Sequence, residues 1–139
     1  MHIKTSNQPK MSMGIGNYEC NWGLHICGLY ETEKERDDFI FGLLCQGLKD
    51  GDLQLYAPAE RTKEEFKKQF SGFCNCAKND TLEDSDKIQI YNPKDLYYPS
   101  GVFSPEAMQK GLSDFFKYSQ RNGKRNIRAT AEMVWALEA

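Results

Sequence analysis

One histidine and two cysteines near the start of the chain have the residue types and spacing for chemistry. Cys20, His25 and Cys27 form a C-x4-H-x-C pattern, which offers three ligands to a metal ion. Structural zinc sites usually supply four ligands with paired C-x2-4-C spacings, so we predict no metal here. His25 could instead serve Cys27 as the base of a nucleophile pair, because residues two apart share one face of a strand. A hydrogen-bonded structural histidine is the other interpretation of His25.

A second group of candidates stands near the other end of the sequence. Arg128 and Glu132 are four residues apart. They could pair with each other, or Arg128 could hold an anionic ligand through two hydrogen bonds. Trp135 follows shortly after, and its large apolar area favours a place in the core or in an interface over a role as a ligand platform.

Strands and helices must bring these side chains together. We expect strands at residues 24–30, 53–57, 87–91 and 126–131, with amphipathic helices between them. Thr32, Thr62 and Ser104 are suited to cap the three helices. The resulting β-α-β-α-β-α-β order predicts an α/β fold whose mainly parallel sheet has helices on both faces.

Tyrosines stand at the positions where ligands bind in such folds, which is beyond the carboxyl ends of the strands. Tyr30 and Tyr56 end the first two expected strands, so both are candidates for ligand binding. A tyrosine at a strand end is also often a core ring with a solvated hydroxyl. Tyr97 lies in a loop with further aromatic residues, and this loop could cover a pocket.

The sequence lacks the phosphate-binding motifs that many α/β folds carry. A P-loop requires G-x4-G-K-[ST], whereas residues 30–38 read YETEKERDD and would repel phosphate through their carboxylates. Residues 13–20 contain two glycines before the first expected strand, which is not a dinucleotide fingerprint. The sequence has no G-x-S-x-G nucleophile motif. We therefore predict no cofactor and no enzyme activity.

Composition and charge exclude several classes of protein. The 139 residues include 18 Lys and Arg against 20 Asp and Glu, so the chain lacks the cationic surplus of a direct nucleic-acid binder. No apolar run approaches the roughly 18 residues of a membrane span, and the start shows no signal peptide. We expect a cytoplasmic protein whose five cysteines are reduced thiols, with a flexible N-terminal arm at residues 1–18 and one domain at residues 19–139.

Four segments together resemble one protein family. They read HICGLYETEKE at residues 25–35, GLKDGDLQLYA at 47–57, YYPSGVFSPEAM at 97–108 and RATAEMVWAL at 128–137. In this order and spacing they are similar to the MEDS domain, the methanogen/methylotroph sensory domain first described in a dichloromethane-responsive regulator. The last segment is the most specific of the four.

The resemblance implies a RecA/KaiC-like three-layer fold without its P-loop, and a non-catalytic domain that senses small molecules such as hydrocarbon or methyl-compound derivatives. It also implies that the signal acts through a separate signalling or regulatory protein, for example in transcription regulation. Eight residues are candidates for ligand binding: His25, Cys27, Tyr30, Tyr56, Tyr97, Arg128, Glu132 and Trp135. Two alternatives stay open, a degenerate ATPase fold that serves only as a protein-interaction module and a small enzyme that uses His25.

The length of the chain bears on its assembly. Domains of this family usually continue past Trp-Ala-Leu with another helix and strand, whereas this sequence stops at Ala139. The sequence is therefore expected to be either a C-terminally truncated form of the domain or one that completes its sheet by dimerising. A shorter sheet would have an open edge and an uncovered apolar face, and both favour association. We therefore predict a homodimer.

Overall fold

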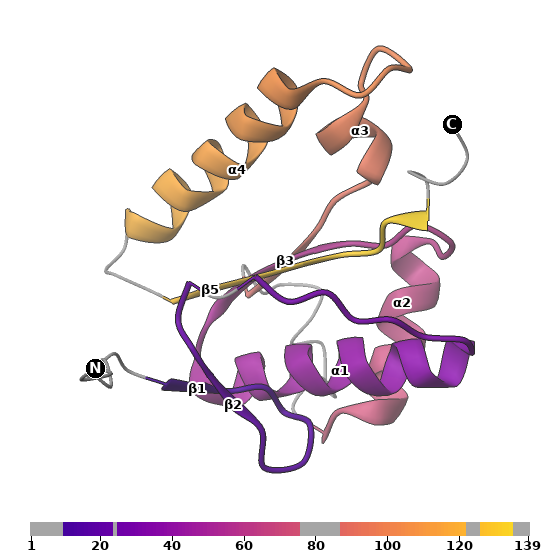
Figure 1. The fold of residues 1–139 in the computed structure, drawn as a ribbon, viewed down its shortest axis with the longest axis vertical. Coiled ribbons are helices and arrows are strands. Elements are labelled where there is room, and N and C mark those ends of the chain that lie inside the picture. Colours follow the sequence, from indigo (N-terminus) through magenta and orange to yellow (C-terminus); the bar gives the residue numbers. More distant parts are fainter. Residues whose placement is uncertain (1–9, 24, 76–86, 122–125, 135–139) are drawn as a thin grey trace, which may run out of the picture.

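A parallel sheet of three strands forms the centre of the molecule. The computed structural model describes residues 10–23, 25–75, 87–121 and 126–134. The strands are β3 (Leu53–Ala57), β4 (Ile88–Ile90) and β5 (Ile127–Ala131), in the order β4-β3-β5 (Figure 1). Each residue of β3 faces one residue of β5, and both neighbours of β3 run parallel to it. All three strands lie where the sequence predicts them, and their predicted parallel arrangement is confirmed.

The three predicted helices are also present, as α1 (Glu33–Asp50), α2 (Lys63–Phe73) and α4 (Pro105–Gln120). The side chains of Thr32, Thr62 and Ser104 each accept a hydrogen bond from the backbone N–H three residues later, which makes each of them an N-cap. α1 ends at Gly51, whose φ of 75° is the left-handed conformation that glycine adopts at low cost.

Helices cover both faces of the sheet, so the fold has three layers (Figure 1). On one face Tyr56 packs against α1 and α2, where Phe66 is one of the buried rings. On the other face Leu55 packs with Phe115 of α4 and with a short additional helix, α3 (Pro93–Tyr97). The sequence predicts a loop where α3 forms, but a capping asparagine followed by proline is enough to start a helical turn.

The predicted first strand is wrong for residues 25–30, which have no regular secondary structure. This segment packs on α1 instead. Gly28 lies against the Phe39 ring of α1, so close that a Cβ atom placed on Gly28 would be 3.3 Å from that ring. Its apolar side chains face solvent, and Leu29 is 94% exposed. Within the part of the chain that the structure describes, β5 therefore pairs with β3 alone and its other edge is open.

Two short strands precede this segment, β1 (Lys10–Ser12) and β2 (Glu19–Asn21), and they pair antiparallel. The sequence predicts a loose arm up to residue 18, and this prediction is wrong for the part of the arm that forms the hairpin. Gly14 and Gly16 have φ of 74° and 52°, which lets the chain turn back between the strands. Gly14 also lies against the backbone of Gly42 in α1, where neither glycine leaves room for a side chain.

Cys45 and Cys74 form a disulfide, so the prediction of reduced thiols is wrong for these two residues. Cys45 lies on the buried face of α1 and Cys74 directly follows α2. Their Cα atoms are 5.7 Å apart, a separation that a disulfide spans easily. An odd cysteine count could not reveal which two residues the helices bring together. Cys20 and Cys27 are free thiols, and Cys76 lies outside the described residues.

Candidate functional site

Five side chains meet at the carboxyl end of the sheet, and we call them the ionic cluster: Arg36, Asp37, Tyr56, Arg61 and Glu132. They come from the first turns of α1, from the end of β3, from the segment before α2 and from the residue after β5. Figure 1 shows that β3 and β5 end at the side where α1 begins. The parallel topology therefore gathers residues that are far apart in the sequence.

Glu132 is the acceptor at the centre of the ionic cluster. Its Oε1 accepts hydrogen bonds from the Tyr56 hydroxyl at 2.7 Å and from Arg61 Nη2 at 3.1 Å. Its Oε2 accepts a hydrogen bond from the backbone N–H of Ala59 at 2.7 Å. Glu132 is only 3% exposed, so these donors replace the water that a carboxylate would otherwise bind.

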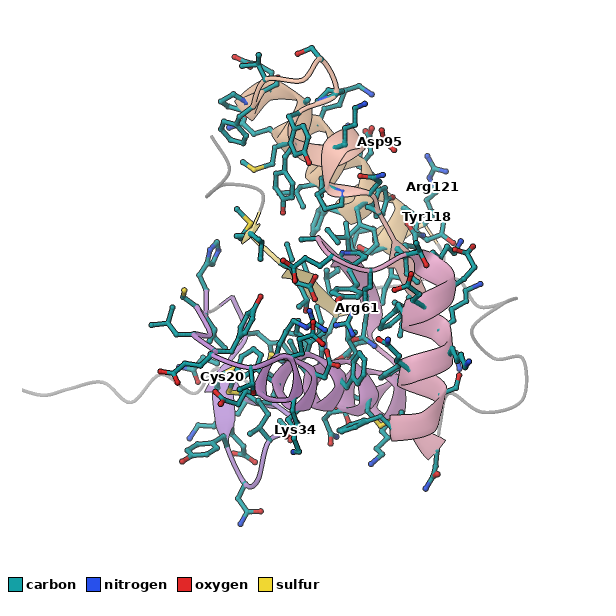
Figure 2. The ribbon with its side chains drawn as sticks, turned by 90° about the vertical axis from the view of Figure 1, so that its right-hand side faces the viewer. Cys20, Lys34, Arg61, Asp95, Tyr118 and Arg121 are labelled. Carbon is teal, nitrogen blue, oxygen red and sulfur yellow. A yellow bond between two sulfur atoms is a disulfide. The ribbon has the colours of Figure 1, made fainter. Side chains whose placement is uncertain are left out.

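Arg61 joins most of the other members. Its Nη1 lies 2.8 Å from Asp37 Oδ1 of α1 and donates a hydrogen bond at 3.0 Å to Oε1 of Gln69 in α2. Its Nε and Nη2 both donate to the Tyr56 hydroxyl, at 3.0 and 2.8 Å. The guanidinium also lies over the Phe41 ring, 4.8 Å from its centroid. Figure 2 shows Arg61 between the sheet and α1.

A second buried guanidinium balances the charge of the ionic cluster. Arg36 Nε lies 3.0 Å from Asp37 Oδ1 and 3.6 Å from Glu132 Oε1. Two guanidinium groups therefore face two carboxylates, with the half-exposed Glu60 3.7 Å from Arg36 Nη1 at the rim. Charges removed from water need such compensation, because an unpaired buried charge is strongly unfavourable.

The environment of Tyr56 keeps its hydroxyl protonated. Burial, and then the hydrogen bond and charge of Glu132, raise the pKa of Tyr56 far above its ordinary value, although Arg61 opposes this. The phenol therefore acts as a fixed donor to Glu132 and as an acceptor for Arg61. The hydroxyl proton of Tyr56 is therefore engaged in an internal hydrogen bond to Glu132.

Arg128 occupies a different site, at the amino end of the sheet. Its Nε lies 2.7 Å from Asp52 Oδ2 and its Nη2 lies 3.0 Å from Asp50 Oδ2. Its Nη1 donates a hydrogen bond to the carbonyl of Ser12 in the hairpin, and the guanidinium lies 5.9 Å from the Trp22 ring centroid. Of the two alternatives for Arg128, the pairing with Glu132 is therefore wrong, because four residues of strand separate the two residues by about 13 Å.

The other predicted residues are dispersed. His25 and Cys27 are exposed in the irregular segment, and Tyr30 in the same segment is 40% exposed. Tyr97 is buried on the opposite face of the sheet with Leu96 and Phe115, so it is a core residue and not part of a lid. Trp135 lies outside the described residues.

Of the seven candidates that the structure describes, only Tyr56 and Glu132 meet in the ionic cluster. Sequence reasoning missed Arg36, Asp37 and Arg61, because charges at the start of amphipathic helices are normally solvated. One signal was available for Arg61, which follows the end of β3 by four residues and so belongs to the edge where ligands bind in parallel sheets.

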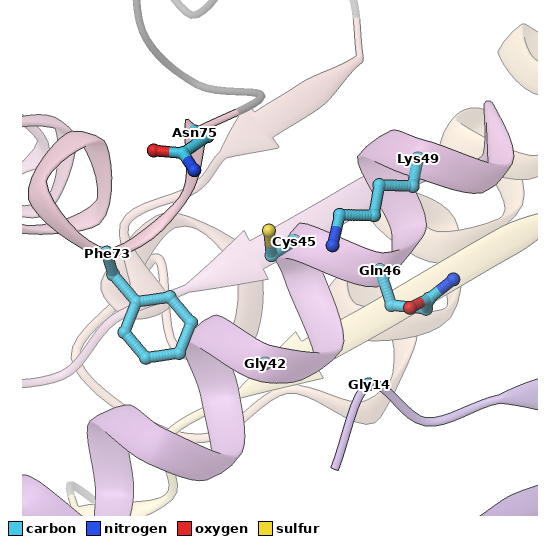
Figure 3. Close-up of a pocket in the computed structure, with 7 residues that line it drawn as sticks. All are labelled: Gly14, Gly42, Cys45, Gln46, Lys49, Phe73 and Asn75. Atoms are coloured by element: carbon cyan, nitrogen blue, oxygen red, sulfur yellow. The ribbon is translucent and has the colours of Figure 1, made fainter. Parts of the chain in front are cut away.

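A pocket lies elsewhere, along α1 beside Cys45 of the disulfide (Figure 3). Its volume is about 270 Å³. It is lined by Gly14, Gly42, Cys45, Gln46, Lys49, Phe73 and Asn75. In the described residues, no three His, Cys, Asp or Glu side chains gather where they could hold a metal ion. None of the helices that the structure describes has the length and apolar composition needed to cross a membrane.

Comparison with known proteins identifies one family. The family model described as "MEDS: MEthanogen/methylotroph, DcmR Sensory domain" matches residues 24–139, which include every member of the ionic cluster. This match confirms the resemblance seen in the sequence. Comparisons with curated proteins and with solved structures gave no match.

Proposed function

We propose, from the premise that this chain belongs to the family of methanogen/methylotroph, DcmR sensory domains, that it is a non-catalytic sensor of small molecules. The family is one of sensory domains, which fits a sensory or regulatory role. The observation that carries the proposal is the ionic cluster, in which Arg61 and Glu132 connect α1, β3, α2 and the end of β5 at one place. A ligand at this edge would act on four elements at once.

The coupling between ligand and fold follows from the shared partners in the ionic cluster. Arg61 contacts Asp37 in α1, Gln69 in α2 and Glu132 after β5. A ligand that displaces one of these contacts leaves a buried polar group unpaired unless a helix shifts to replace the partner. Ligand binding therefore changes the position of α1 relative to α2, and this change is the signal.

The charge balance favours an uncharged ligand. Arg36 and Arg61 both face carboxylates already, so neither is a ready site for an anion. Apolar side chains stand close to the ionic cluster in the sequence, and Met133, which follows Glu132, is 50% exposed. Tyr30, shortly before α1, is 40% exposed. Hydrocarbon or methyl-compound derivatives have the small apolar surface that these side chains would cover.

The output of the sensor is a contact with another protein. On α4, Leu112 and Phe116 are 38% and 57% exposed and lie one helical turn apart, which gives the domain an apolar stripe on its outer layer. Together with the edge of β5 that no other described strand covers, this stripe supports association with a second copy or with a regulatory protein. We also propose a RecA/KaiC-like ancestry, which the three layers and parallel sheet support. Light scattering would detect a homodimer as twice the 16.0 kDa of one chain, and a monomer at high concentration would contradict it.

Thermal unfolding in the presence of small molecules tests the proposed ligand class. Dichloromethane and methanol serve as uncharged probes at low concentration, and acetate and ATP serve as charged controls. A ligand that binds only the folded protein raises the melting temperature by mass action, by several degrees at about 100 times its dissociation constant. An increase caused only by the charged compounds would contradict the proposal.

Two substitutions locate the binding site. Tyr30→Ala and Met133→Ala should remove most of the ligand-induced increase, because both side chains are exposed and stand close to the ionic cluster in the sequence. Val102→Ala is the matched control, since Val102 is also apolar and 72% exposed but lies in the loop before α4. Equal responses in all three variants would place the ligand elsewhere.

A further inference from the structure

The disulfide holds together the two helices that cover one face of the sheet. Cys45 belongs to α1, and Cys74 directly follows α2. Both are part of the hydrophobic core between these helices and β3, together with Phe41 and Phe70. Breaking this bond would remove the covalent link between the end of α2 and α1, so the state of the two sulfur atoms bears directly on how these helices are joined.

The two cysteines of the disulfide differ in their exposure to solvent. Cys74 is fully buried, whereas Cys45 is 9% exposed and lines the pocket of about 270 Å³. Figure 3 shows Cys45 on α1, between Phe73 and Lys49, at the side of the helix that the pocket occupies. Thiol–disulfide exchange requires that a thiolate reach one sulfur directly. The pocket provides that access on the Cys45 side.

The lining of the pocket selects a particular kind of thiol. Of the described residues around it, Lys49 alone carries a charge, and Figure 3 shows its side chain extending toward Cys45. Gln46 and Asn75 contribute amide groups, and Phe73 contributes a half-exposed ring. The volume is slightly below the about 300–1,000 Å³ of pockets that hold drug-sized ligands. The pocket therefore fits a small thiol that carries a carboxylate, with the carboxylate at Lys49 and the sulfur at Cys45.

We propose that the Cys45–Cys74 disulfide is a thiol-exchange site, served by this pocket, for small thiols that carry a carboxylate. The thiolate sulfur bonds to Sγ of Cys45 while the bond between the protein sulfurs breaks. The electron pair leaves on Sγ of Cys74, which takes a proton from water. A second thiol of the same class then displaces Cys45, giving a small-molecule disulfide and two protein thiols. The site is separate from the ionic cluster, so it adds a redox input to the proposed sensor.

The location of the freed sulfur makes this exchange selective. Cys74 follows the last residue of α2, so its sulfur can leave the core when the end of the helix opens. A buried thiolate is a poor leaving group in apolar surroundings, because burial disfavours its charge. Exchange is therefore slow for thiols that only collide with the protein and faster for one that the pocket holds in place.

The test uses the full chain with its other cysteines, Cys20, Cys27 and Cys76, replaced by serine. The oxidised protein is treated with mercaptoacetate or with mercaptoethanol at equal thiolate concentrations, quenched with acid, and analysed by peptide mass spectrometry. We expect the mixed disulfide on Cys45, forming about threefold to fivefold faster with mercaptoacetate, which is the effect of one partly exposed ion pair. An adduct on Cys74, or equal rates with the two thiols, would overturn the proposal.

Substitutions of one lysine separate the role of the pocket from general reactivity. Lys49→Gln should abolish the preference for mercaptoacetate, while Lys49→Arg should retain it because the positive charge stays. Lys34→Gln is the control, since Lys34 is an exposed lysine at the other end of α1. A preference that survives in Lys49→Gln, or disappears equally in Lys34→Gln, would show that the pocket does not select the thiol.

Discussion

Replacing Glu132 by Gln changes the charge at the centre of the ionic cluster while nearly keeping its shape. Glu132 accepts hydrogen bonds from Tyr56, Ala59 and Arg61. The amide of Gln has one acceptor oxygen, so its NH2 group must face a donor that the carboxylate had satisfied. The hydrogen bond from Arg61 also loses the negative charge of its acceptor, although Arg61 keeps Asp37 as a partner.

The loss of stability caused by Glu132→Gln follows from these contacts. Leaving one buried donor unsatisfied costs about 1–3 kcal/mol, and removing the acceptor's charge from an ionic hydrogen bond costs about 1 kcal/mol. We therefore expect Glu132→Gln to lower the free energy of unfolding by about 3 kcal/mol, close to the cost of breaking a buried ion pair. Urea unfolding, followed by far-UV circular dichroism and tryptophan fluorescence, measures this difference when the m value is unchanged.

Asp114→Asn is the matched control for this experiment. It removes the same charge from an exposed pair, in which Lys110 Nζ lies 3.3 Å from Asp114 Oδ2 and both side chains are more than half exposed. Such a pair within a helix contributes only about 0.3–0.5 kcal/mol. If Glu132→Gln costs no more than Asp114→Asn, the ionic cluster does not hold its four elements together, and the argument for coupling between them fails.

Three further predictions concern other parts of the fold. Burial raises the pKa of Tyr56 and of Tyr97 above the ordinary value of 10.0, so the folded protein holds protons that the unfolded chain releases. Stability should therefore fall as the pH rises above about 10, and spectrophotometric titration should show fewer than all seven tyrosines ionising before the protein unfolds. Gly47→Ala should destabilise by about 1–3 kcal/mol in urea unfolding, because its Cβ would collide with the buried Gln54 side chain. Arg128→Ala should lower the free energy of unfolding by about 3–5 kcal/mol, because it leaves the buried carboxylate of Asp52 unpaired. Limited proteolysis should then cleave the hairpin, and an unchanged cleavage pattern would contradict the role of Arg128 in anchoring it.

Local patterns in the sequence predict much of the fold. The caps at Thr32, Thr62 and Ser104 and the apolar stripes behind them are properties of short segments, so the helices could be placed from the sequence. The segment at residues 25–30 has the apolar composition of a strand, yet a strand also needs a hydrogen-bonding neighbour, and composition does not supply one. The hairpin could not be predicted because its residues are polar and lack the apolar composition of a strand. Its two strands pair because Gly14 and Gly16 allow the chain to turn back between them.

The candidate site could be predicted only in part. Parallel topology was enough to bring Tyr56 and Glu132 to the same edge, because both stand at strand ends. The burial of Arg61 was not predictable, because it depends on a carboxylate 71 residues away in the sequence. Arg128 shows the same limit, since its partners come from the hairpin and from the end of α1. A side chain whose partners are distant in the sequence leaves no local pattern from which its burial could be predicted.

The contacts of Arg128 also have a consequence for the order in which the chain folds. The hydrogen bond from Arg128 to the carbonyl of Ser12 spans 116 residues. During synthesis, Ser12 is therefore made early and can form this hydrogen bond only after Arg128 has been added. At about 5–20 residues per second, this delay is roughly 6–23 seconds on the ribosome. Contacts of such long range also slow folding in the free chain. The hairpin is therefore expected to be the last part of the molecule to acquire its final position, after the sheet has formed beside it.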